Sequence, residues 1–101
     1  MTTAILSALA PEQSGLLKAL GQAQHTVHGG RVFSHGTLHG QPVVLALSGI
    51  GKVAAATTAA VLIERFGVSR IVFTGVAGGV GEGVAVGDIV VAQDYVQHDM
   101  D

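Results

Sequence analysis

The segment from Lys52 to Phe66 constrains the fold of this chain most strongly. It is rich in alanine and contains neither glycine nor proline, so it predicts a helix. Gly67 follows directly and suits the left-handed position that ends many helices. Because alanine side chains leave little bulk outside the backbone, this helix can approach a β-sheet closely. The rest of the chain is therefore expected to supply that sheet.

Short apolar segments on both sides of this helix predict strands. Ala4 to Leu9 is almost uninterruptedly apolar, and an amphipathic segment from Glu12 to Leu20, with its leucines on one face, predicts a first helix. Ile71 to Phe73 is fully apolar, as in strands that are covered on both faces. Asp88 to Gln93, preceded by a turn at Val86-Gly87, predicts the last strand.

A different pattern lies between these elements, where short β-prone runs alternate with glycines. Val32-Phe33 and Val43 to Leu47 flank the sequence Leu38 to Pro42, which predicts a turn between two antiparallel strands. The whole order predicts an α/β fold with a mixed central β-sheet flanked by helices. No stretch of residues 1–101 has the composition of a linker, so no internal domain boundary is expected.

Composition narrows the possible functions. The five Lys and Arg residues are dispersed and the net charge is −2, so no nucleic-acid partner is expected. No apolar run approaches the ~18–20 residues of a membrane-spanning helix. There is no cysteine, which excludes disulfides and a cysteine nucleophile and favours the cytoplasm. The Ala8-Leu9-Ala10 sequence resembles a signal cleavage site, but no basic residue precedes it, so a buried first strand is the better interpretation.

Three predicted strands end in small or polar residues. These ends are Ala8 to Glu12, Ser48 to Gly51, and Thr74 to Gly79. Ligands of open α/β sheets bind beyond the carboxyl ends of the strands, so all three ends are candidate site segments. Small residues in the third would let the main chain contact a flat ligand, although a tight turn explains the same glycines.

Glu12 is the candidate catalytic residue. It falls at a strand end beside an apolar pocket, where a carboxylate can act as a general base. The alternative is a structural role in which the acid caps the first turn of a helix and complements the helix dipole. The residues alone leave both interpretations open.

The Gly49-Ile50-Gly51-Lys52-Val53-Ala54 sequence fits the glycine pattern of a dinucleotide-binding turn. The next strand, however, ends in Thr74-Gly75 and offers no acid to hold a ribose diol. A triphosphate-binding loop is excluded because Val53 stands where magnesium binding needs Ser or Thr. A non-catalytic module that binds a nucleoside or dinucleotide nevertheless stays an alternative.

No metal site is expected. His35 and His39 are four residues apart, but Gly36 and Gly40 oppose the helix that would place both on one face. His98 to Asp101 could contact a cation, yet a solvated segment is the simpler interpretation.

The motifs carry more information together than singly. In order and spacing they resemble the 5′-methylthioadenosine/S-adenosylhomocysteine nucleosidases, within the wider nucleoside phosphorylase superfamily. The similarity runs from about Ala4 to the last residue, through Ser48 to Ala56, Thr74 to Gly79, Val86 to Val91, and His98 to Asp101. It implies the N-terminal part of a single larger domain, a homodimer, no cofactor, and a pocket for adenine, ribose and a 5′-alkylthio group.

The resemblance also implies individual roles. Glu12 would contact the attacking water, Ala8 and Leu9 would border the ribose, and Ile50 would line the apolar 5′-thio pocket. The sugar and base would be backed by Val76, Ala77 and Gly78. Many family members have serine where this chain has Val76, so a contact from that hydroxyl would be absent or replaced by the backbone.

The implied reaction is hydrolysis of the bond between adenine and ribose. Glu12 would activate the attacking water. The family's acid that protonates the purine and its ribose-binding glutamate lie far downstream, so residues 1–101 alone are expected to be inactive. Phosphorylases of the superfamily carry arginines where this chain has Ala8 to Pro11 and Phe73, so water is favoured over phosphate. Two alternatives are hydrolysis of another purine nucleoside such as futalosine, and a structural half-domain that serves only assembly.

Overall fold

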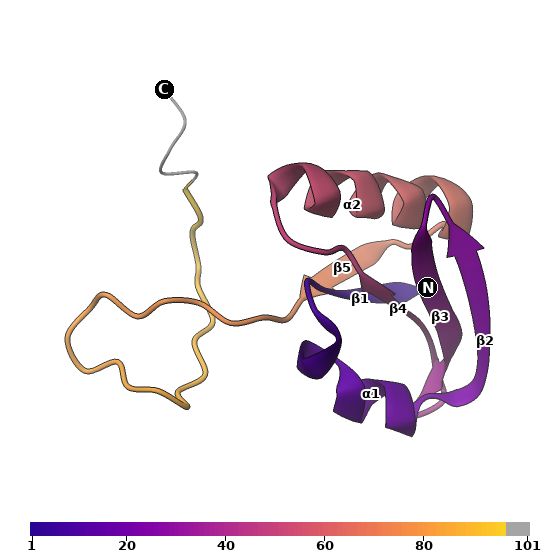
Figure 1. Cartoon of the computed structure of the whole chain (residues 1–101). Helices are drawn as coiled ribbons and strands as arrows, with labels where there is room; N and C mark the ends of the chain where they lie inside the picture. The colour runs from indigo at the N-terminus through magenta and orange to yellow at the C-terminus, as the bar shows by residue number, and fades with distance from the viewer. Residues whose placement is uncertain (97–101) are drawn as a thin grey trace.

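The computed structural model describes residues 1–96, which form a five-stranded sheet with helices on both faces (Figure 1). The strand order is β2-β3-β4-β1-β5. The elements in chain order are β1 (Thr3–Ser7), η1 (Ala10–Glu12), α1 (Ser14–Ala19), β2 (Gly21–His28), β3 (Arg31–Leu38), β4 (Gln41–Leu47), α2 (Lys52–Phe66) and β5 (Arg70–Phe73). The predicted mixed α/β fold is confirmed.

The sheet is parallel in one half and antiparallel in the other. β1 runs parallel to β4 and β5, with Leu6 opposite both Ala46 and Phe73. β2, β3 and β4 form an antiparallel meander. The carboxyl ends of β4, β1 and β5 therefore lie side by side at one edge of the sheet.

Two tight turns set the register of the meander. His39 and Gly40 join β3 to β4 and have φ angles of 52° and 77°. Gly29 and Gly30 join β2 to β3 with φ angles of 60° and 76°. Positive φ at both central residues matches the right-handed twist of the flanking strands. The predicted turn between Leu38 and Pro42 is confirmed.

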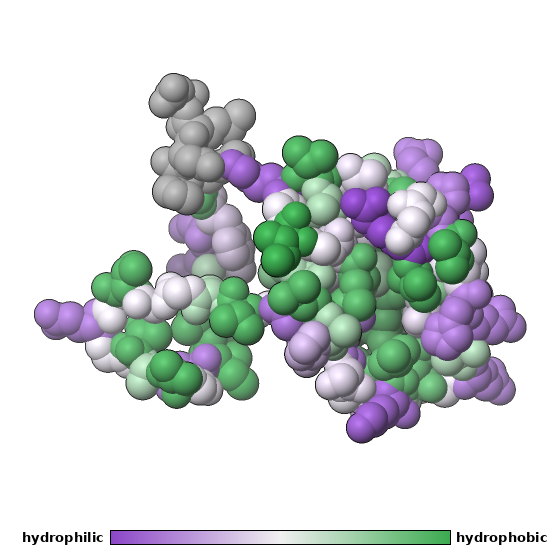
Figure 2. Space-filling view, viewed as in Figure 1, coloured by the Kyte–Doolittle hydropathy of each residue, from purple (hydrophilic) through white to green (hydrophobic). Residues whose placement is uncertain are grey.

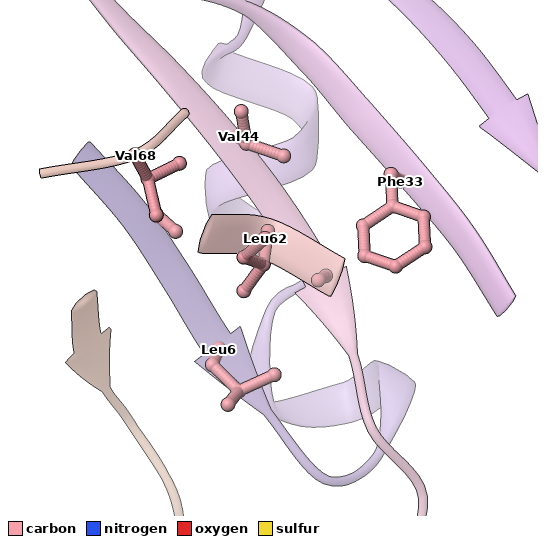
Figure 3. Packing of buried hydrophobic residues seen from close by; sticks show 7 residues of the cluster. Leu6, Phe33, Val44, Leu62 and Val68 are labelled. Carbon is pink, nitrogen blue, oxygen red and sulfur yellow. The ribbon is translucent and has the colours of Figure 1, made fainter. Parts of the chain in front are cut away.

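α2 covers one face of the sheet and has the predicted bounds, with Gly67 left-handed at φ 61°. Leu62 is fully buried against the sheet, close to Leu6 and Val44 (Figure 3). The rings of Phe33 and Phe66 pack with centroids 5.0 Å apart. Full burial of a leucine side chain is worth about 1.5–3 kcal/mol. Alternate residues of β1 and β4 point to this face, in a cluster of Ala4, Leu6, Phe33, Val44, Ala46, Leu62 and Val68.

The opposite face of the sheet packs against the segment that contains α1. Leu20 is buried there with Val43 and Leu45, and Leu16 packs against them. The predicted helix from Glu12 to Leu20 is interrupted at Gln13, whose φ of −124° and ψ of −3° separate η1 from α1. Leu17 was predicted on the apolar face but is 45% exposed.

The strand predicted at Asp88 to Gln93 is wrong for the described residues. Beyond β5 the chain leaves the sheet as an extended arm without helix or strand up to residue 96 (Figure 1). A strand needs a neighbour for its backbone N–H and C=O groups, and no strand among residues 1–96 lies alongside the arm. The turn at Val86-Gly87 does form, with Asp88 N donating to Ala85 O at 3.1 Å.

The arm carries much of the exposed apolar surface. Figure 2 shows it as a separate lobe with several hydrophobic residues. Its exposed aliphatic residues are Val76, Val80, Val84, Val86, Ile89, Val90, Val91 and Val96. β5 was expected to be covered on both faces, but it pairs only with β1 in the described chain, and Phe73 is 60% exposed.

No helix among residues 1–96 is long and apolar enough to cross a membrane. The motif predicted at His98 to Asp101 lies outside the described residues.

Candidate active site

The three predicted strand ends meet at one edge of the sheet. β1 lies between the other two, and its hydrogen bonds continue beyond the regular strands on both sides. Ser48 N donates to Ser7 O at 2.9 Å, and Thr74 N donates to Leu6 O at 2.9 Å. The segments that follow β4, β1 and β5 therefore begin next to one another.

Glu12 connects two of these segments. Its Oε1 accepts hydrogen bonds from Leu9 N at 2.8 Å and Ala8 N at 3.1 Å. Its Oε2 accepts a hydrogen bond from Val76 N at 3.0 Å. One half-buried carboxylate thus fixes the turn after β1 and draws the loop after β5 towards it.

A pair of hydroxyls connects the same two segments, after β1 and after β5. Ser7 Oγ and Thr74 Oγ1 are 2.7 Å apart, and Ser7 is completely buried. Ser7 ends β1 and Thr74 follows β5, so the pair joins side chains where the backbone ladder ends. Sequence analysis marked Thr74 as part of a loop and missed its pairing with Ser7.

Gly75 gives the carboxylate room. A Cβ placed on Gly75 would lie 3.2 Å from Glu12 Oε2 and 2.9 Å from Phe73 Cε1. The first distance is tighter than ordinary van der Waals contact, so a side chain at this position would press on the carboxylate. Absence of a side chain at residue 75 is therefore part of the geometry that holds Glu12.

Gln13 is a buried polar residue that sequence analysis missed. Its Nε2 donates to Ile5 O at 2.8 Å and to Ala46 O at 2.9 Å. Its side chain therefore ties the segment after Glu12 to β1 and β4. Nothing in the sequence marked it, because a glutamine beside an amphipathic helix usually faces solvent.

The structure brings Ala8, Leu9 and Val76 to Glu12 through their backbone N–H groups. The Leu9 side chain is 48% exposed and that of Val76 is 90% exposed, so both face outward from the edge of the sheet. Ile50 stands in the loop after β4 with its side chain 79% exposed.

Ala77 and Gly78 are less closely placed. Both follow Val76 in the exposed arm, and no hydrogen bond within residues 1–96 connects them to Glu12. Their predicted contact with sugar and base rests only on their place in the chain after Val76. Hydrogen bonds to Glu12 hold Ala8, Leu9 and Val76.

The carboxylate fits both interpretations of Glu12. It caps backbone N–H groups, as the structural interpretation predicts. A carboxylate offers about four acceptor positions, and the described protein donors use three. Oε2 receives one of these bonds, which leaves it able to accept a hydrogen bond from a water molecule on the open side of the edge.

The histidine pair His35 and His39 does not meet further ligands among the described residues. No three His, Asp or Glu side chains cluster within residues 1–96. His35 instead lies beside Thr26, with Nε2 3.4 Å from its hydroxyl, and its ring packs 5.9 Å from that of Phe66.

This fold and site define an α/β protein whose ligand-binding site lies at the carboxyl ends of the parallel strands of its sheet. A sequence profile of the phosphorylase superfamily matches residues 2–101. The chain belongs to that superfamily.

Its relatives are nucleosidases. The chain is 46% identical over its whole length to a 5′-methylthioadenosine/S-adenosylhomocysteine nucleosidase of Colwellia psychrerythraea, and it spans 42% of that relative. The crystal structure of a nucleosidase of this name from the same organism, in complex with adenine, matches 87% of this chain and 36% of that chain with a TM-score of 0.85. A futalosine hydrolase mutant of Helicobacter pylori is 32% identical, with a TM-score of 0.81 over 87% of this chain and 40% of that chain. The family resemblance predicted from the motifs is confirmed.

Proposed function

We propose that the protein containing this chain hydrolyses the N-glycosidic bond of 5′-methylthioadenosine and S-adenosylhomocysteine, releasing adenine and the thioribose product. The observation that carries this proposal is the position of Glu12. It is an acid held by three backbone N–H groups at the edge where the parallel strands end. The identity to nucleosidases supports the substrate class.

The chemistry requires a carboxylate at this place. Departure of the purine builds positive charge on the ribose and negative charge on the base. A carboxylate below the sugar stabilises the first charge and orients a water molecule for attack at the anomeric carbon. Backbone N–H groups hold Glu12 in place before substrate arrives, so little reorganisation is needed during the reaction.

The neighbouring residues would shape the pocket. Ala8 and Leu9 would border the ribose from the β1 side, and the exposed Ile50 side chain would contact the 5′-thio group. Val76, Ala77 and Gly78 would back the sugar and base. Because the N–H of Val76 already binds Glu12, that residue would act through its backbone and needs no side-chain hydroxyl.

Water is favoured over phosphate as the nucleophile. A phosphate dianion below the ribose would need cationic partners. The chain has Ala8 to Pro11 after β1 and Phe73 before the third segment, so neither position supplies a positive charge.

Hydrolysis of futalosine is the second candidate. It is favoured by the similarity to the Helicobacter pylori futalosine hydrolase, whose TM-score is close to that of the Colwellia nucleosidase. Both reactions cleave a purine base from a ribose, and the two substrates also differ in the group beyond the 5′ carbon. Comparison of both substrates with one enzyme preparation separates them.

The remaining parts of the proposal concern the whole protein. The acid that protonates adenine and the ribose-binding acid are expected outside residues 1–101, so this chain alone would be inactive. We further expect a cytoplasmic homodimer. The outer surface of α2 suits a protein contact, because Val53 and Ile63 are 80% and 53% exposed and Ala56 and Ala60 lie between them.

The experiment is an analysis of the products that the full-length protein forms from 5′-methylthioadenosine. In phosphate-free buffer we expect adenine and methylthioribose in equal amounts, and added phosphate should not change the rate. Formation of a sugar phosphate would contradict hydrolysis. Failure to release adenine from either thioadenosine, together with release of the free purine base from futalosine, would favour the second candidate.

A further inference from the structure

A groove opens where the β2–β3 turn separates from the end of β4. Phe33 and Ala46 are the last pair between β3 and β4. Beyond them β3 continues with β2, whereas Ser48 bonds to β1, so the two strands diverge. The groove has a volume of about 480 Å³ and is lined by Gly29, Gly30, Arg31, Val32, Leu47, Ser48 and Gly49.

Arg31 supplies the charge of this groove. It is the charged residue of the lining, and its side chain is half-buried. Its Nη1 donates to Gly29 O at 3.3 Å, whereas its Nε is buried and has no hydrogen-bond partner among residues 1–96. A guanidinium has five N–H donors, and the one acceptor described for it here uses a single donor of Nη1, so other N–H groups of the fork can bind a carboxylate through two parallel hydrogen bonds.

The groove reaches the segment after β4, next to a residue of the proposed substrate site. Gly49 lines it and is bonded to Ile50, the residue proposed to contact the 5′-thio group. A substituent on the sulfur that extends from Ile50 along the Gly49 side of this segment would enter the groove that Arg31 lines. The two proposed substrates differ in this substituent, since methylthioadenosine ends in a methyl group and S-adenosylhomocysteine carries an amino acid with a free α-carboxylate.

We propose that Arg31 binds the α-carboxylate of the homocysteine tail and so determines how well the enzyme uses S-adenosylhomocysteine relative to methylthioadenosine. This inference rests on the proposed nucleosidase function and adds a specificity-determining residue to it. Arg31 takes no part in bond breaking. Its effect falls on the ratio of kcat/KM between the two substrates, because only one of them offers a carboxylate.

The test compares both substrates with the full-length protein and its Arg31→Gln and Arg31→Lys variants. Arg31→Gln should lower the ratio of kcat/KM for S-adenosylhomocysteine to that for methylthioadenosine by about 10-fold or more, the usual effect of losing a charged hydrogen bond. Arg31→Lys keeps the charge but loses the fork, so its ratio should be intermediate. Arg70→Gln, at the exposed start of β5, is the matched control and should leave the ratio unchanged.

A third substrate tests the role of the carboxylate in the wild-type enzyme as well. The 3-aminopropylthio analogue of the homocysteine compound lacks only the carboxylate. The wild-type enzyme should use it about 10-fold less well than S-adenosylhomocysteine, and Arg31→Gln should remove this difference.

The outcomes separate the inference from the function on which it rests. Equal ratios in wild type and Arg31→Gln, with both substrates hydrolysed, would overturn the role of Arg31 and leave the nucleosidase proposal intact. A phosphate-dependent rate that Arg31→Gln abolishes would assign the guanidinium to a phosphate site and overturn the inference. Absence of adenine release from both substrates by the wild type would overturn both proposals.

Discussion

Glu12 and Val76 are 64 residues apart in the chain, yet Val76 N donates to Glu12 Oε2 at 3.0 Å. The bond joins the segment after β1 to the loop after β5. The other carboxylate oxygen binds the backbone of Ala8 and Leu9, so the position of one side chain depends on two strand ends. Substitutions that move either end are therefore expected to affect activity.

Gly75→Ala should weaken catalysis without unfolding the protein. The new Cβ would lie 3.2 Å from Glu12 Oε2, and although the exposed Phe73 ring can turn away, the carboxylate would have to shift. Small displacements of a catalytic group are expensive, so kcat/KM for methylthioadenosine should fall about 10-fold or more. Gly81→Ala, where a Cβ meets nothing within 4 Å, is the control. Equal activity of the two variants would contradict the account of Gly75.

The Ser7–Thr74 hydroxyl pair should be energetically coupled. Thr74→Val keeps the shape of the side chain but leaves the fully buried Ser7 hydroxyl without its partner, at a cost of about 1 kcal/mol or more in the free energy of unfolding. Ser7→Ala in the same protein should remove much of that penalty. A double-mutant cycle by denaturant unfolding measures the coupling, and strict additivity would show that the contact contributes nothing.

Gln13→Ala should destabilise the fold. It removes the donor that serves Ile5 O and Ala46 O from a side chain that is only 6% exposed. The expected loss is about 2 kcal/mol in the free energy of unfolding. Gln24→Ala on the exposed strand β2 should stay within about 0.5 kcal/mol. Similar stability of the two variants would show that the hydrogen bonds of Gln13 do not stabilise the fold.

Two glycine substitutions should have opposite signs. A Cβ at Gly36 would collide with the backbone oxygen of Gly21 on the neighbouring strand β2, so Gly36→Ala should lower the free energy of unfolding by about 2 kcal/mol. Gly15 lies within α1 and has open space around its Cα, so Gly15→Ala should raise stability by about 0.5–1 kcal/mol. Thermal unfolding of both variants checks the contrast.

Most of the fold was predictable because it depends on local patterns. Alanine between Lys52 and Phe66 predicted α2 with its bounds, and the segment from Leu38 to Pro42 predicted the turn that sets the β3–β4 register. The strand at Asp88 to Gln93 was predicted from the same kind of pattern and failed. A strand depends on a partner, and sequence pattern does not reveal whether a partner lies alongside.

The site was predictable in position but not in its bonding. Motif order placed Glu12, Ile50 and Val76 at strand ends, and the parallel pairing of β4, β1 and β5 brings those ends to one edge. The Ser7–Thr74 pair and the Gln13 bonds escaped prediction, because each joins residues that only the tertiary fold brings together. Their residue types are common on surfaces and carry no local signal.

The central claim is that the carboxylate of Glu12 activates the water that cleaves the glycosidic bond. Single-turnover release of adenine from methylthioadenosine by the full-length Glu12→Gln protein tests it directly. Glu64→Gln on the exposed side of α2 is the matched control, and a melting curve for each variant separates lost chemistry from lost structure. We expect the rate to fall by roughly 10²-fold or more for Glu12→Gln alone. A folded Glu12→Gln enzyme that releases adenine at the wild-type rate would contradict the claim.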